Sequence, residues 1–190
     1  MKKNLLIFAL AFFIISSLAM SQVTVKQPRF YGPDRNPSIV DVVLNINQAT
    51  ASGENPGQFS ILIAALQAAD PGVLETLAGE PWGFYTLFAP TDAAFVELLG
   101  ELGLTAEELQ AEQELVTEVL KFHVTNGTNY AFRVVKSPRL LTLSGEYILQ
   151  EGGILTDLSE REANIIAVDI PTVNGVIHVI DRVILPIDIR

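Results

Sequence analysis

The sequence predicts an α+β fold formed by one domain. Between residues 38 and 123, apolar side chains recur mainly at helical spacing behind residues that favour helix starts, whereas beyond residue 138 the chain divides into short apolar runs separated by glycine. Helices that come first and strands that come later are typical of helices packed on a largely antiparallel or mixed sheet. No internal repeat is visible, so we expect one copy of the domain.

The first predicted helices follow directly on a proline-rich stretch. Ser38 and Asp41 form a capping-box pattern ahead of an apolar run, so a short helix is expected to start there. Asp70 and Pro71 end the next helix and cap the one after it. The two later helices carry apolar residues at helical spacing, namely Phe59, Leu62, Ile63 and Leu66, then Val73, Leu74 and Leu77.

A strand, a turn and two helices are predicted next. The run from Phe84 to Phe88 is rich in β-forming residues and stops at Ala89-Pro90, after which Thr91 or Asp92 can cap a helix. A second capping box begins at Thr105 and opens a helix expected to reach His123, with its acidic residues on a solvated face. The apolar side chains of these helices are Phe95, Leu98 and Leu99, then Leu109, Val116, Val119 and Leu120.

The second half of the chain is predicted to be β. Ser144-Gly145 is typical of a hairpin turn, and Asn174-Gly175 is a strong short turn signal because both residues tolerate positive φ. The expected strands lie in the apolar runs 140–143, 147–149, 154–155, 165–168 and 176–185.

The N-terminus has the pattern of a removable export signal. Lys2 and Lys3 precede an apolar run of 11 residues, which is short for a membrane-spanning helix, and small residues follow at Ala19 and Ser21. We expect a signal peptide over residues 1–21, a flexible tether over 22–36 and a folded domain over 37–188. The mature protein is then secreted, either periplasmic or extracellular, with no integral membrane segment.

Charge and cysteine content narrow the class of protein. The formal net charge is −10 and becomes −12 when the leader takes Lys2 and Lys3 with it. Because nucleic-acid binding depends on Lys and Arg that neutralise phosphates, such an acidic chain is not expected to bind nucleic acid. The chain has no cysteine, which excludes thiol catalysis and thiolate metal sites. Together with the short positive start of the leader, the lack of cysteine favours a bacterial over a eukaryotic secreted protein.

A search for catalytic motifs finds none. The sequence lacks a nucleophile elbow, a P-loop, a dinucleotide-binding glycine motif and a zinc-protease motif. His123 and His178 are the two imidazoles, and each lies inside an apolar segment where a structural hydrogen bond is the simpler explanation. The carboxylates Asp157, Glu160 and Glu162 show no spacing that requires an acid–base pair. We therefore expect no enzyme activity, no cofactor and no metal site.

Three stretches together resemble the fasciclin domain. Residues 86–95, which read TLFAPTDAAF, are similar to the first signature of that family. Residues 120–124 resemble its central Tyr-His motif, with Phe122 where Tyr is common, and residues 174–181 resemble its second signature. The positions that carry the two signatures, which we expect to be mainly structural, are Thr86, Phe88, Pro90, Thr91, Asp92 and Phe95, then Asn174, Gly175, His178 and Asp181.

The resemblance implies a fold and candidate partner-binding residues. Members of the family form a wedge of two β-sheets with helices packed around it, and they take part in adhesion at cell surfaces or in the extracellular matrix. In animal members, binding to integrin-type receptors is linked to the Tyr-His motif and to an Asp-Ile pair before the second signature. The matching residues here are Phe122, His123, Asp169 and Ile170, where the Phe lacks the Tyr hydroxyl.

Three functions follow from the sequence and the resemblance. The first is a non-enzymatic binding module that mediates adhesion through a cell-surface or matrix protein or a polysaccharide. The second is a carrier of an apolar small ligand, carotenoid-like or lipid-like, because some relatives of this fold bind such pigments. The third is a hydrolase, for which the sequence offers no catalytic constellation.

Overall fold

The computed structural model describes residues 37–51, 58–79 and 83–186. The predicted leader and tether, and the last two residues of the predicted domain, lie outside the described residues. The described helices are α2 (Ile39–Ala51), α3 (Ser60–Ala68), α4 (Pro71–Ala78), α5 (Asp92–Leu102), α6 (Ala106–Ala111), α7 (Gln113–Phe122) and α8 (Ala131–Val134). The described strands are β1 (Tyr85–Pro90), β2 (Val124–Asn126), β3 (Arg139–Leu141), β4 (Tyr147–Glu151), β5 (Ile154–Thr156), β6 (Glu162–Thr172) and β7 (Gly175–Ile180).

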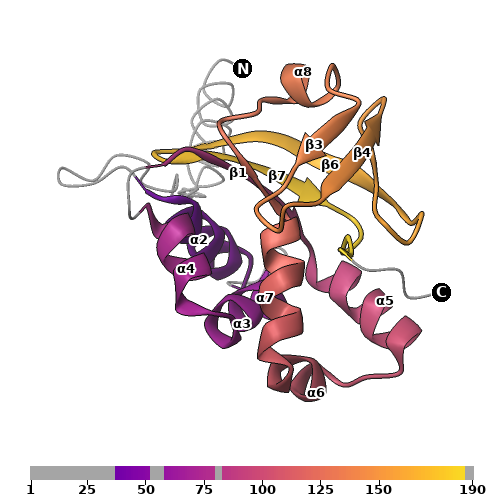
Figure 1. The fold of residues 1–190 in the computed structure, drawn as a ribbon. Coiled ribbons are helices and arrows are strands. Elements are labelled where there is room, and N and C mark those ends of the chain that lie inside the picture. The colour runs from indigo at the N-terminus through magenta and orange to yellow at the C-terminus, as the bar shows by residue number, and fades with distance from the viewer. Residues whose placement is uncertain (1–36, 52–57, 80–82, 187–190) are drawn as a thin grey trace, which may run out of the picture. The chain divides into compact units, whose positions relative to one another are not determined.

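The predicted α+β class is confirmed, and the strands form one seven-stranded sheet whose two parts share β6. The hydrogen-bonded order is β2-β1-β7-β6-β5-β4-β3. The first three residues of β6 pair with β5, and its later residues pair with β7. Most neighbours are antiparallel, but β1 and β7 run parallel over six residue pairs. Figure 1 shows α2 to α7 gathered beside the β1–β7 part of the sheet, and α8 lying on the far side near β3 and β4.

The sheet curls until its two ends meet. A bridge joins Thr125 of β2 to Thr142, the residue after β3, and the Leu143 amide donates to the Val124 carbonyl at 2.8 Å. This closure leaves few unpaired edges and encloses a core. The buried members of that core are Phe88, Phe122, Val134, Leu140, Ile148, Leu155, Ala163, Ile180 and Ile184.

Local capping signals place the helices as predicted. The Ser38 amide donates to the Asp41 carboxylate at 2.9 Å, and the Asp41 amide donates to the Ser38 hydroxyl at 3.2 Å, which completes the first capping box. The second box, at Thr105, is also complete. Asp70 caps α4 and Thr91 caps α5 through side-chain oxygens. Each cap satisfies amides that have no partner within their own helix.

The single helix predicted from Thr105 to His123 is wrong. The chain forms two helices there, because Glu112 leaves the helical conformation with φ −90° and ψ 66° and ends α6. Neither proline nor glycine marks this break in the sequence. The turn re-aims the chain so that both α6 and α7 pack against α3. Packing between helices distant in sequence therefore overrides the local pattern.

The hairpin predicted at Asn174-Gly175 is confirmed, although its glycine acts differently from the expectation. Thr172 pairs with Gly175, so the turn residues are Val173 and Asn174, and Gly175 begins β7. A Cβ atom on Gly175 would lie 1.8 Å from the carbonyl oxygen of Tyr85 on β1. Glycine is therefore required at position 175 for two reasons. The β1 backbone approaches β7 too closely for a side chain, and the φ of 153° is one that residues with a side chain rarely adopt.

Asn174 joins three elements to this turn. Its Oδ1 accepts a hydrogen bond from the Ile39 amide of α2 at 2.9 Å, and its Nδ2 donates to the Leu77 carbonyl of α4 at 2.9 Å. The Tyr85 amide donates to the Asn174 backbone carbonyl at 2.9 Å. Because the side chain is buried, no water replaces these partners, and the bonds fix the helices to the sheet.

We expect Asn174→Ala to lower the free energy of unfolding by about 2–4 kcal/mol, because it leaves a buried amide and a buried carbonyl without partners. Urea unfolding followed by circular dichroism measures the change. Asn126→Ala, at an exposed position on β2, serves as the control and should change stability by no more than about 0.5 kcal/mol. Equal stability losses in the two variants would contradict this account.

Candidate functional site

Phe122 and His123 lie in the interior of the protein. Phe122 has no exposed surface, and the ring of His123 is 1% exposed. Nδ1 of His123 donates to the Val119 carbonyl at 2.7 Å, while Nε2 accepts from the Ile184 amide at 3.1 Å. This pair of bonds requires a neutral ring with its proton on Nδ1. Burial lowers the pKa of His123 to about 4, against the smaller opposing effect of the bond to Val119.

His178 is a second buried histidine, and it holds a loop against the sheet. Its Nε2 donates to the Asn129 carbonyl at 2.8 Å, and its Nδ1 accepts from the Asp169 amide at 3.3 Å. Burial lowers its pKa, which the bond to Asn129 and the nearby charge of Asp169 only partly oppose. The Asp169 carboxylate lies 4.0 Å from Nδ1, but with a neutral ring this contact is no ion pair. The ring also stacks on Phe88 at 5.5 Å.

Asp169 occupies an irregular part of β6 beside this histidine. The β6–β7 register shifts between Ala167 and Ile170, and Asp169 has a φ of 59°, which is unusual for a residue other than glycine. Its Oδ1 accepts a hydrogen bond from the Ala131 amide at 2.7 Å and so holds the first residue of α8. The exposed carboxylate therefore positions α8, and Ile170 beside it is half-buried against Ile177.

The four predicted partner-binding residues therefore do not form one surface. Asp169 is exposed, Ile170 is partly so, and Phe122 and His123 are enclosed by the core. In this conformation a macromolecular partner can contact Asp169 but cannot reach Phe122 or His123. The Phe122-His123 pair connects α7 to β2 and to the segment at Ile184.

The signature residues make contacts inside the domain. The Thr86 hydroxyl donates to the Gly127 carbonyl at 2.7 Å and accepts from the Asn129 amide at 2.8 Å. The Asp92 carboxylate accepts hydrogen bonds from the amides of Ser60 at 3.1 Å and Ile61 at 2.8 Å, which are the first two residues of α3. Asp92 therefore caps α3 and not its own helix. Asp181 accepts two hydrogen bonds from Asn164 across the β6–β7 pair. Phe88 and Phe95 are buried, and Pro90 ends β1.

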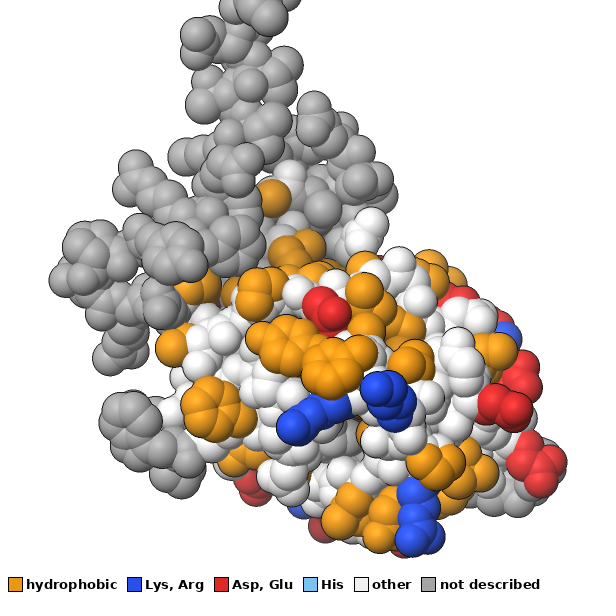
Figure 2. Space-filling view, turned by 90° about the horizontal axis from the view of Figure 1, so that it is seen from above, with side chains coloured by type: hydrophobic (Ala, Val, Ile, Leu, Met, Phe, Trp, Pro, Cys, Tyr) orange, Lys and Arg blue, Asp and Glu red, His pale blue; other side chains and the backbone are white. Residues whose placement is uncertain are grey.

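A surface of exposed apolar and basic side chains surrounds α8. We name it the α8 face, and Figure 2 looks down on it: apolar side chains adjoin Lys and Arg there, one acidic side chain lies among them, and most other acidic side chains lie along one edge of the view. The exposed Asp169 carboxylate, which holds the start of α8, borders this face. Phe132 is 59% exposed and Val135 is 50% exposed, which leaves large apolar areas in water. The residues of the α8 face are Tyr130, Phe132, Arg133, Val135, Lys136, Arg139, Leu141, Tyr147 and Leu149.

The scaffold beneath the α8 face is well anchored. Asp169 holds the start of α8, as described above. With its amide nitrogen facing α8, the buried Gln150 side chain donates to the carbonyls of Val134 at 2.9 Å and Ser137 at 3.1 Å. The guanidinium of Arg139 lies 4.9 Å from the ring centre of Tyr147, a cation–π contact between neighbouring strands. The exposed side chains therefore project from a fixed backbone.

The basic residues of the described chain divide into two groups. Lys121, Arg161 and Arg182 form ion pairs with Glu118, Glu101 and Glu97. Arg133, Lys136 and Arg139 have no ion pair among the described residues, and all three belong to the α8 face. Within the ranges that the structure describes, the cations without an ion pair therefore lie together, between exposed apolar side chains.

Sequence reasoning missed this face. The segment 130–139 carries no periodic pattern and matches no signature. The one available signal was local charge: three basic residues fall within seven positions of a chain that has only 12 Lys and Arg.

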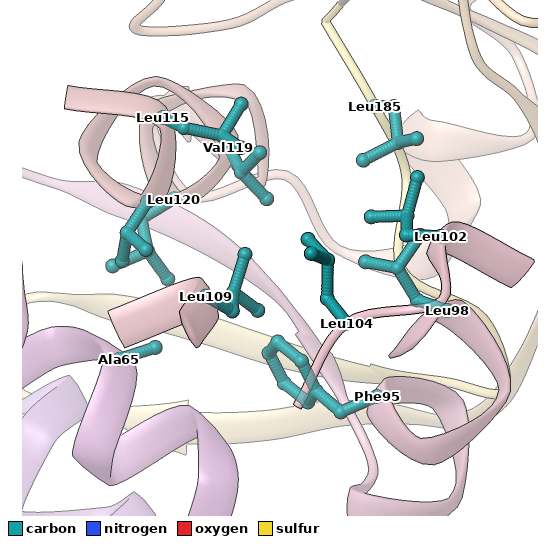
Figure 3. A pocket seen from close by; sticks show the side chains of 11 residues that line it. Ala65, Phe95, Leu98, Leu102, Leu104, Leu109, Leu115, Val119, Leu120 and Leu185 are labelled. Atoms are coloured by element: carbon teal, nitrogen blue, oxygen red, sulfur yellow. The ribbon is translucent and has the colours of Figure 1, made fainter. Parts of the chain in front are cut away.

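A cavity of about 150 Å³ lies among the helices on the other side of the domain. Figure 3 shows its side chains converging from α3, α5, α6, α7 and the segment at Leu185. Every lining residue is apolar: Ala65, Phe95, Leu98, Leu102, Leu104, Leu109, Leu115, Val116, Val119, Leu120 and Leu185.

The described residues hold neither a candidate metal site nor a helix that could span a membrane. Within residues 37–51, 58–79 and 83–186, no three His, Asp or Glu side chains come together in a way that could hold a metal ion. In the same ranges, no helix has both the length and the apolar character to cross a bilayer.

We expect protonation of His123 to lower the free energy of unfolding by about 2 kcal/mol between pH 7 and pH 5, and protonation of His178 to add a loss of the same sign. Both pKa values are lowered on folding, so the unfolded chain binds more protons below its histidine pKa of 6.5. The stability contributed by a neutral buried ring is present above pH 6.5 and is lost as the pH falls towards the folded pKa. Urea unfolding at intervals of half a pH unit measures this.

His123→Gln should flatten the pH profile between pH 7 and pH 5, since its ring has the folded pKa of about 4. His178→Gln tests the second ring in the same way. A profile for both variants as steep as that of the unmodified protein would show that other groups cause the pH dependence.

Comparison with known proteins gives the family. The model of the fasciclin domain matches residues 57–186. The chain is 32% identical over 184 residues to the protein sll1483 of Synechocystis, which covers 93% of this chain and 94% of that protein. It is 30% identical over 141 residues to the cell surface glycolipoprotein MPB83 of Mycobacterium bovis, covering 73% of this chain and 60% of that protein.

A solved structure of the FAS1 domain pair from the insect cell adhesion molecule fasciclin I also matches, with a TM-score of 0.49 and 16% identity, over 63% of this chain and 42% of that one. The match of the family model to most of the chain decides the assignment. The protein belongs to the fasciclin domain family.

Proposed function

We propose that this protein is an exported, non-enzymatic adhesion module that binds an acidic cell-surface or matrix protein or polysaccharide through its α8 face. The observation that carries this proposal is the group of three unpaired cations set among exposed apolar side chains. Adhesive binding here requires only a surface of fixed shape and complementary charge. No catalytic group is needed.

Charge favours an acidic partner. Arg133, Lys136 and Arg139 have no anionic partner among the described residues, while the whole chain carries a net charge of −10. A negatively charged partner is attracted to this face and is repelled by most of the remaining surface. Such asymmetry fixes the orientation of binding and raises the association rate.

Apolar side chains supply the second part of the proposed interface. Phe132 and Tyr130 are aromatic residues at the surface, and residues of this type often provide most of the binding energy of an interface. A sugar ring or a protein side chain can pack on them while its acidic groups meet the cations. The anchored α8 loses little conformational freedom on binding, which reduces the entropic cost.

Export supports the same function. The N-terminal pattern predicts removal of residues 1–21 and release from the cytoplasm, and one relative is named as a cell surface glycolipoprotein. We propose that the mature protein is periplasmic or extracellular and is retained at surfaces by what it binds.

We expect the double variant Arg133→Gln/Lys136→Gln to weaken binding to envelope fragments or extracellular polymer of the producing organism by about 3- to 30-fold. This range corresponds to about 0.3–1 kcal/mol for each exposed charge. The effect is measured, at low and at high salt, as the ligand concentration that half-saturates the immobilised protein. The loss should shrink at 0.5 M salt, because ions screen exposed charges.

Lys121→Gln/Arg182→Gln is the matched control, because it also removes two cations, both outside the α8 face. It should bind as the unmodified protein does. Equal weakening by the two double variants would show that net charge matters and that the α8 face does not, which would contradict the proposal.

We expect Phe132→Ser to weaken the same binding by about tenfold or more, as truncation of a central aromatic does at many interfaces. Val96→Ser is its control, because Val96 is 62% exposed on α5, away from α8. Unfolding curves of both variants confirm that the fold is kept. Binding that survives Phe132→Ser unchanged would remove the apolar half of the proposed interface.

A further inference from the structure

We propose that the cavity among α3, α5, α6 and α7 is a binding site for the end of a hydrocarbon chain whose polar group carries no negative charge. This inference is independent of the adhesive function, because it depends on residues of the helical side of the domain and on none of the α8 face. It narrows the apolar-carrier function predicted from the sequence to one site and one class of molecule.

The apolar lining of the cavity disfavours the binding of polar molecules. All lining side chains are hydrocarbon, so a water molecule inside the cavity would find no hydrogen-bond partner. The volume, about 150 Å³, is close to that of apolar cavities in proteins that stay dry and take up a benzene molecule. The space therefore admits one ring or a few methylene groups, and only the end of a longer molecule.

The cavity has a rim at the surface. Phe95, Leu98 and Leu120 are almost completely buried and form its inner wall. Leu102 and Leu115 are partly exposed, as is Leu104 in the connection between α5 and α6. A chain that enters between these leucines places its first atoms against the inner wall and leaves its polar end at the surface.

Unpaired acidic residues give the α6–α7 part of the domain a local negative charge, which selects the polar end of a bound chain. Glu107, Glu112 and Glu114 are exposed on α6, α7 and the turn between them, and none has an ion pair among the described residues. They stand close in sequence to the lining residues Leu109 and Leu115. A carboxylate or phosphate at the rim meets their repulsion, whereas a hydroxyl or another neutral group does not. A neutral lipid or alcohol therefore fits better than a fatty acid.

The test uses 1-decanol and decanoate at pH 7.5 as probes, with the purified protein in thermal unfolding and methyl NMR. We expect 1-decanol at a hundredfold excess over its Kd to raise Tm by roughly 5–10 °C. It should shift the methyl signals of the lining leucines and valines. Decanoate, which has the same chain and a negative charge, should raise Tm by less than a third as much.

Ala65→Leu fills the cavity and should abolish the effect of 1-decanol on Tm. Ala93→Leu adds the same atoms at an exposed position of α5 and should leave that effect unchanged. Where Ala65→Leu is too crowded to fold, Ala65→Val reduces the volume by less and should weaken the effect in proportion. The Arg133→Gln/Lys136→Gln variant should keep the full response to 1-decanol, so failure of this proposal and failure of the adhesive function are separable.

Absence of a Tm rise, or a rise that persists in Ala65→Leu, would overturn the site. Equal effects of decanoate and 1-decanol would overturn the selection for a neutral end.

Discussion

The parallel pairing of β1 with β7 is the constraint on which the rest of the structure depends. β7 is buried along its whole length and β1 along all but its first residue, so each strand must be covered on both faces. The helices cover one face, and the curled sheet with its enclosed core covers the other. Gly175 permits the close approach of the two backbones. Asn174 then ties α2 and α4 to the point where this pairing begins.

This constraint separates the domain into two sides with different chemistry. On the side of β3 and β4, Asp169 and His178 hold the start of α8 and the loop before it, so exposed apolar and basic residues project from a fixed backbone. On the other side, α5, α6 and α7 meet around an apolar cavity. The buried histidines belong to the frame between these sides: each is neutral, and each joins segments distant in sequence.

Local features were predictable from the sequence, and distant contacts were not. The capping boxes at Ser38 and Thr105 involve residues three positions apart, so their signals lie within one short window. By contrast, the break at Glu112 follows from packing of α6 and α7 on α3, and the bonds of Asn174 span 135 and 97 residues. The candidate residues Phe122 and His123 came from a family resemblance, which carries no information about burial. The α8 face joins the continuous segment 130–139 to Leu141, Tyr147 and Leu149, which only the folded strands bring beside it.

The most direct test of the central claim is site-specific photocrosslinking to the envelope of the producing organism. A benzophenone amino acid replaces Phe132 on the α8 face in one preparation and Val96 on α5 in another, since the two side chains are similarly exposed, 59% and 62%. We expect covalent adducts from position 132, suppressed by excess unmodified protein, and none above background from position 96. Adducts from position 96 alone, or from neither position while the protein still binds the envelope, would contradict the assignment of binding to the α8 face.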